Sequence, residues 1–239
     1  SIFKRNLYSK KMKLLKDFFY LFYPNICANC NEQLLQNEKV ICTFCRHDLP
    51  LTNFQSYTIN KVSRIFSGRI TIEKAYALLF FRKQGITKNL IHDLKYKGNE
   101  EVGVFFGNWI GEIVAKNKEF STVDFIVPVP IHAKKKKIRG YNQVTKFGEC
   151  LSMHLKVPLN EDVLIRQSAT KTQTLKSRFE RFNDLESKFL ARNTSIFKEK
   201  HILIIDDVIT TGATLEACAK ELLKTPGIKI SILTMSYTE

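Results

Sequence analysis

The chain has 239 residues, enough for one full α/β domain and one small module. Hydrophobic residues make up 44% and charged residues 26% of it, which is ordinary for a globular protein and excludes wholesale disorder. The formal charge of +15 indicates an anionic partner: nucleic acid, a phosphorylated ligand or an anionic membrane surface. No run approaches the roughly 18 apolar residues of a membrane span, and residues 14–23 make a poor signal peptide, so we expect a soluble, cytoplasmic protein.

The N-terminal part is expected to be a basic arm and an amphipathic helix over residues 1–23, followed by a small metal module over 24–50. Met12 is an alternative start, so the sequence leaves open whether residues 1–11 are native. Four of the six cysteines have the spacing C-x2-C-x11-C-x2-C, namely Cys27, Cys30, Cys42 and Cys45. Paired knuckles of this kind predict a structural Zn²⁺ with four thiolate ligands and no open position. The alternative is a redox pair or unpaired thiols.

Residues 51–69 are rich in Asn, Ser, Thr and Gly, which predicts a connector, and residues 70–239 alternate between strand and helix patterns. The predicted strands are 75–81, 124–129, 163–166, 202–205 and 228–235. The predicted helices are 86–94, 102–113, 144–155, 176–190 and 213–224. Alternation of this kind predicts an α/β fold whose mostly parallel sheet is covered by helices on both faces.

The most informative segment is ILIIDDVITTGAT, at residues 202–214. A buried strand ends in Asp206 and Asp207, where ligands of open α/β sheets bind. The turn that follows offers backbone N–H groups and hydroxyls at a helix N-terminus, which together suit a phosphate. The acids suit ribose hydroxyls, with a Mg²⁺ nearby that they would hold indirectly. The predicted phosphate loop is Val208, Ile209, Thr210, Thr211, Gly212, Ala213 and Thr214. The plainer alternative is a strand that ends in a helix cap.

This segment resembles the 5-phosphoribosyl-1-pyrophosphate (PRPP) motif of type I phosphoribosyltransferases. The resemblance implies that the two acids hold the ribose 2′- and 3′-hydroxyls and that the loop holds the 5′-phosphate. Further motifs resemble the signature of the ComF family (ComFC and GntX-like proteins): KYKG at 95–98, VPVP at 127–130, RGYNQ at 139–143 and K-x-Q at 171–173. The resemblance covers residues 24–237 and implies a type I phosphoribosyltransferase fold preceded by a zinc finger.

Other polar residues are weaker candidates. Lys134–Lys137 and Arg139 form a predicted basic loop after a strand end, in which Lys135 and Arg139 would meet a pyrophosphate; the alternative is a solvated loop. Asn142 and Gln143 begin a helix as caps or as ligand contacts. Residues 170–174 predict a polar flap over the site, with Lys171, Gln173 and, beside it, Arg178 as candidates.

The ComF resemblance implies a cytoplasmic protein of DNA uptake in natural transformation, with single-stranded DNA and DNA-uptake or recombination proteins as partners. Two alternatives stay open. One is a working phosphoribosyltransferase for an amine or a base, and the other is a module that senses PRPP or a nucleotide without turnover. Hypoxanthine-type enzymes carry an acid where this chain has Thr210, so we assign no catalytic residue.

Overall fold

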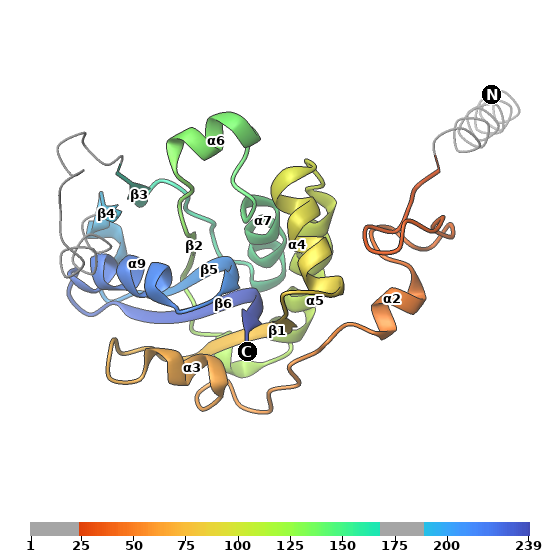
Figure 1. The fold of residues 1–239 in the computed structure, drawn as a ribbon. Helices are drawn as coiled ribbons and strands as arrows, with labels where there is room; N and C mark the ends of the chain where they lie inside the picture. Colours follow the sequence, from red (N-terminus) through yellow and green to blue (C-terminus); the bar gives the residue numbers. More distant parts are fainter. Residues whose placement is uncertain (1–23, 168–188) are drawn as a thin grey trace, which may run out of the picture. The chain divides into compact units, whose positions relative to one another are not determined.

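The computed structural model describes residues 24–167 and 189–239 (Figure 1). The chain divides into two compact units, residues 1–49 and residues 50–239. The predicted arm and helix over 1–23 lie outside the described residues. So do most of the predicted helix 176–190 and the flap candidates Lys171, Gln173 and Arg178.

The described part of the first unit consists of tight turns and one short helix, α2 (Thr43–His47). An isolated bridge pairs Ile26 with Gln33, and the turn between them contains Asn31 in the left-handed region at φ +63°. With so little regular structure, this segment depends on its cysteines for stability.

The second unit is built on a four-stranded parallel sheet with the order β1-β6-β5-β2. Its strands are β1 (Ala75–Phe81), β2 (Phe125–Pro128), β5 (His201–Ile209) and β6 (Lys229–Thr238). They are almost continuously buried, as expected where helices cover both faces, although β6 also buries the hydroxyl residues Ser231, Thr234 and Ser236. The sheet confirms the predicted α/β fold.

Helices lie on both faces of this sheet. On the face that carries Ile205, α7 (Thr145–Leu155) packs so closely that a Cβ on Gly148 would lie 2.8 Å from the Ile205 side chain. Helix α5 (Glu101–Ala115) packs against α7. In turn, α4 (Ile86–Tyr96) and the short η1 (Lys118–Phe120) contact α5. On the opposite face, Ile204 shares a buried cluster with α9 (Ala213–Leu223). Within the described residues, no helix is both long and apolar enough to cross a membrane.

A second, two-stranded antiparallel sheet joins β3 (Leu164–Arg166) to β4 (Phe189–Ala191), and η3 (Thr194–Phe197) follows it. The helix predicted over 176–190 is therefore wrong at its end, because Phe189 and Leu190 pair with Arg166 and Ile165 as a strand. Phe189 is buried in the same cluster as α9.

The segment 51–69 differs from the connector expected there. It carries α3 (Lys61–Phe66), which begins with a capping box between Asn60 and Ser63. Val62 and Phe66 of this helix are fully buried in the cluster that includes α9. Six helical residues with two buried side chains are too few to show a helical period in the sequence, and this helix forms because it packs against the sheet domain.

Candidate functional site

The two acids lie inside β5 and not at its end. The strand continues to Ile209, since Asp206 pairs with Thr234 and Val208 with Ser236 of β6. The predicted strand end at residue 205 is therefore wrong. Successive side chains of a strand point to opposite faces, so Asp206 lies on the α9 side and Asp207 on the α4 side.

Asp207 is paired with a lysine that is far away in the sequence. Lys95 Nζ, near the end of α4, lies 2.8 Å from Asp207 Oδ1, and the Asp207 side chain is 5% exposed. The other carboxylate oxygen, Oδ2, is buried without a hydrogen-bond partner among the described residues. A buried oxygen with no partner carries an energetic penalty, and a bound ligand that donates to it would remove that penalty.

Asp206 has different surroundings. Burial and the nearby charge of Asp207 raise its pKa to about 8, against the opposing effect of the Asp207 N–H, which donates to Asp206 Oδ1 at 2.8 Å. At neutral pH this carboxyl is therefore mostly protonated, so the pair carries less negative charge toward a phosphate than two carboxylates would.

The predicted phosphate loop connects β5 to α9. Thr210 and Thr211 are exposed, whereas Gly212 is buried in the left-handed region at φ +75° and forms the N-cap of α9. A Cβ on Gly212 would lie 2.7 Å from Ile65 Cγ2 of α3, so only glycine fits there without a shift. A helix leaves the N–H groups of its first turn without acceptors inside the helix, which suits an anion, and in α9 the N–H of Ala213 donates to Thr211 Oγ1 at 3.4 Å.

The structure also brings Lys135 and Arg139 to this end of the sheet. They line a pocket of about 250 Å³ whose other lining residues are Lys95, Tyr96, Gly98 and Ile138. The Arg139 guanidinium lies 5.6 Å from the centre of the Tyr96 ring. Lys95 belongs to both this pocket and the Asp207 ion pair, so the pocket adjoins the acids.

The basic segment of this pocket is a helix, α6 (Ala133–Arg139), and the predicted loop is wrong. The His132 side chain caps its first turn, and Gly140 ends it at φ +87°. None of its residues is buried, and it follows the carboxyl end of β2 (Figure 1). The sequence lacks apolar periodicity here because the helix has no buried face.

Asn142 and Gln143 support the local backbone. The buried Asn142 side chain donates to the carbonyl of Val129 at 3.1 Å and accepts from the N–H of Val144 at 3.4 Å. The Gln143 side chain accepts from Arg139. Asn142 therefore supports the turn that precedes α7, whose N-cap is Val144, and a ligand contact of Asn142 stays a prediction.

Sequence reasoning missed Arg69, which donates to the carbonyl of Thr211 at 2.9 Å and pairs with Glu216 of α9. It follows α3 in the segment expected to be a connector. No local pattern marked it, because Thr211 and Glu216 are more than 140 residues away along the chain.

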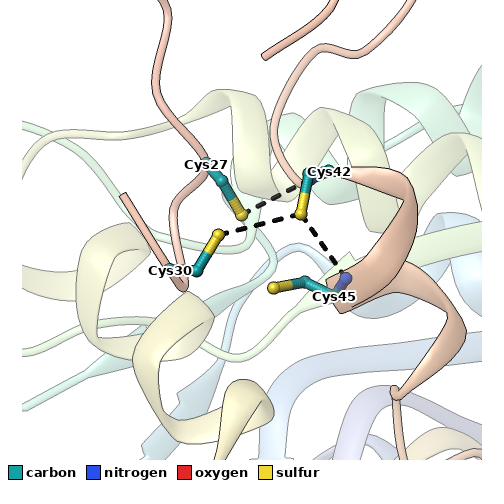
Figure 2. Close-up of side chains that lie close together, drawn as sticks. All are labelled: Cys27, Cys30, Cys42 and Cys45. Carbon is teal, nitrogen blue, oxygen red and sulfur yellow. Dashed lines mark hydrogen bonds between the residues drawn. The ribbon is translucent and has the colours of Figure 1, made fainter. Parts of the chain in front are cut away.

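The four-cysteine cluster forms a second site, in the first unit. The sulfur atoms of Cys27, Cys30, Cys42 and Cys45 all lie within 4.8 Å of one another, and their side chains converge on one point (Figure 2). The sulfurs of Cys30 and Cys42 are 3.7 Å apart. Tetrahedral Zn²⁺ with bonds of about 2.3 Å would place its sulfur ligands about 3.8 Å apart.

The surroundings of these thiols also suit a cation. Burial acts to raise the pKa of Cys27, but backbone N–H groups, including that of Cys42 at 3.4 Å, lower it to about 7. Burial raises the pKa of Cys45 to about 12, although Asn29 Nδ2 donates to its sulfur at 3.2 Å. Four thiolates in so small a volume repel one another, and a bound metal ion would remove that repulsion.

The chain is similar to several known proteins. A phosphoribosyl transferase domain matches residues 146–237, which include the acids and the phosphate loop. Competence protein F of Haemophilus influenzae is 36% identical over 100 residues, 41% of this chain, and the match covers 44% of that protein. Among solved structures, the match to glutamine PRPP amidotransferase of Bacillus subtilis covers 59% of this chain and 30% of that chain, with a TM-score of 0.40 and 15% identity.

Competence protein ComFC of Bacillus subtilis is 31% identical over 215 residues, which cover 86% of this chain and 81% of that protein. A match of this extent covers most of both chains. The chain therefore belongs to the ComF family, in which a domain of the type I phosphoribosyltransferase fold follows a four-cysteine cluster.

Proposed function

We propose that this protein binds PRPP together with Mg²⁺ at the β5–α9 loop and acts in DNA uptake, where it handles single-stranded DNA in the cytoplasm. The observation that carries the ligand proposal is the Lys95–Asp207 pair, since it joins the acids of the phosphoribosyl motif to a pocket lined by further cations. PRPP carries ribose hydroxyls, which acids can bind, beside a pyrophosphate, which cations can bind. It therefore needs acids and cations side by side.

Each part of the ligand has a matching group in this proposal. The 5′-phosphate would accept from N–H groups and hydroxyls of Thr210–Thr214, and the pyrophosphate would meet Lys135 and Arg139. Asp207 Oδ2 is the free acceptor for a ribose hydroxyl, and Mg²⁺ would balance the remaining negative charge near both acids. Zn²⁺ in the four-cysteine cluster would be structural, and its thiols suit the reducing cytoplasm.

The ligand proposal is tested by calorimetric titration with PRPP and Mg²⁺. We expect binding to the wild type and none to the Asp206→Asn/Asp207→Asn variant. Asp162→Asn, which removes an exposed acid elsewhere, is the matched control and should bind like the wild type. A folded wild type that does not bind PRPP would contradict the proposal.

The DNA part is supported by the names of the two competence relatives and by the exposed lysines of α6 beside Tyr96, which is 70% exposed. Cations attract backbone phosphates, and an exposed aromatic ring can stack on a base. Lys135→Gln/Lys136→Gln/Lys137→Gln should weaken binding of a fluorescent oligothymidine. It should also flatten the slope of log affinity against log salt by up to about 2, or about 0.7 per lost contact.

The control for this measurement removes three exposed lysines outside α6, as Lys116→Gln/Lys118→Gln/Lys198→Gln. Equal losses in both triple variants would show that only net charge matters and would remove α6 from the proposal. Release of pyrophosphate from PRPP with an added amine or base would instead favour the transferase alternative.

A further inference from the structure

Arg69 connects the α3 segment to the loop proposed to bind phosphate. Its guanidinium donates to the carbonyl of Thr211 at 2.9 Å and to the carbonyl of Ile65 at 3.0 Å, and it pairs with the carboxylate of Glu216. A planar guanidinium with five donors can satisfy all three acceptors at once, which an ammonium group on the same backbone position would do poorly.

The contact with Thr211 fixes the direction of the next N–H group. The carbonyl of Thr211 and the N–H of Gly212 belong to one planar trans peptide and point in opposite directions. Because Arg69 holds the carbonyl, the N–H of Gly212 points away from Arg69. Side chains of α3 also pack against Gly212: atoms of Ile65 and Phe66 lie within 3.3 Å of the position that a Cβ on Gly212 would take.

We infer that Arg69 is a positioning residue of the phosphate site, which turns the N–H of Gly212 toward the bound phosphate. This inference rests on the proposed function. Glu216 pairs with both Arg69 and Lys220, so its carboxylate offsets only part of the positive charge of Arg69, and the oriented peptide acts on the anion in addition to what remains. Without Arg69 the peptide can rotate, and the helix N-terminus loses one of its aligned donors.

A purely structural role is the competing explanation, since Arg69 also ties α3 to α9. That role predicts a lower free energy of unfolding but an unchanged phosphate affinity in the folded protein. The positioning role predicts weaker affinity and a changed environment of the Gly212 amide, which a structural tie alone would not produce.

The experiment uses ribose 5-phosphate as the probe, with Arg69→Gln, Arg69→Lys and, as matched control, Arg64→Gln from the exposed side of α3. Affinity is measured by calorimetry. The Gly212 amide is followed by NMR after labelling with ¹⁵N-glycine, which gives signals from only 10 residues. We expect Arg69→Gln to bind about tenfold more weakly, as for loss of one charge-assisted hydrogen bond. Arg69→Lys should be intermediate and Arg64→Gln unchanged.

The outcomes separate the two proposals. In the wild type, and to a smaller extent in Arg69→Gln, the Gly212 amide proton should shift downfield when phosphate binds. Wild-type affinity and an unchanged shift in a folded Arg69→Gln would overturn the positioning role and leave the proposed function standing. A wild type that neither binds nor shifts would overturn the proposed function and the positioning role with it. If Arg69→Gln does not fold, Arg69→Lys decides by the same two readouts.

Discussion

Replacing Gly212 by Ala tests how closely α3 and the phosphate loop fit together. The residue has φ +75°, and the left-handed conformation costs a residue with a Cβ about 1–2 kcal/mol. The new Cβ would also lie 2.7 Å from Ile65 Cγ2, closer than real contacts allow, and 3.1 Å from Phe66 Cε1, which is tighter than most real contacts. Relieving such overlap costs about 1–3 kcal/mol. We therefore expect Gly212→Ala to lower the free energy of unfolding by about 2–5 kcal/mol.

Gly68 provides the matched control. Its φ of +71° is nearly the same, but a Cβ there would meet nothing within 4 Å. Gly68→Ala should therefore lose only the backbone part, about 1–2 kcal/mol. The difference between the two variants measures the overlap with α3. Ile65→Ala removes the methyl group that would clash with the new Cβ. In an Ile65→Ala background, Gly212→Ala should therefore lower the free energy of unfolding by less than it does in the wild type.

The assay is urea unfolding followed by the fluorescence of Trp109. This is the single tryptophan of the chain and lies in α5, so the signal reports the sheet domain alone. Zinc content should stay unchanged, because the cysteines belong to the other compact unit. Equal losses of unfolding free energy in Gly212→Ala and Gly68→Ala would refute the reasoning, since overlap with α3 would then add no cost at Gly212.

Three further predictions concern the metal and the charged groups. Removing zinc with a chelator should unfold residues 24–50, because structural zinc contributes about 10–16 kcal/mol in finger peptides; an unchanged proteolysis pattern would contradict this. Asp206 has a folded pKa of about 8, above its ordinary 3.8. Stability should therefore fall by up to about 1.4 kcal/mol per unit as pH rises from 4 to 8, and Asp206→Asn should remove that slope in urea titrations. Lys95→Gln leaves Asp207 buried without its cation and should cost about 3 kcal/mol, whereas Lys88→Gln, at an exposed position of the same helix, should change unfolding little.

The sheet domain could be predicted from the sequence because β1, β2 and the first half of β5 carry uninterrupted apolar runs. The strand predicted over 75–81 is confirmed with the same bounds as β1. The helix predicted over 102–113 is confirmed as part of α5, although its most buried stripe is formed by Gly103, Gly107 and Gly111 as well as by large side chains. A Cβ on Gly107 would lie 2.6 Å from Cys150 Cβ, so these glycines allow α5 and α7 to approach closely.

The elements that were missed have no such pattern. Helix α6 is exposed on all sides, so only its cap at His132 and its end at Gly140 mark it, and both signals are local and weak. Helix α3 has six residues and is stabilised by tertiary contacts of Val62 and Phe66. Short helices of this kind are set by packing against distant residues, which periodicity along the chain does not reveal.

In the candidate site, too, the motif predicts which residues are present but not which distant residues surround them. The motif predicts that two acids precede a phosphate loop, but strand alternation places Asp207 against Lys95 and Asp206 on the opposite face of the sheet. The two carboxyls therefore differ in chemical state: Asp207 is paired with a cation, whereas Asp206 holds a proton at neutral pH. Equal roles at the ribose hydroxyls would require Asp206 to lose its proton, so PRPP binding through both acids should release a proton and strengthen as pH rises toward 8.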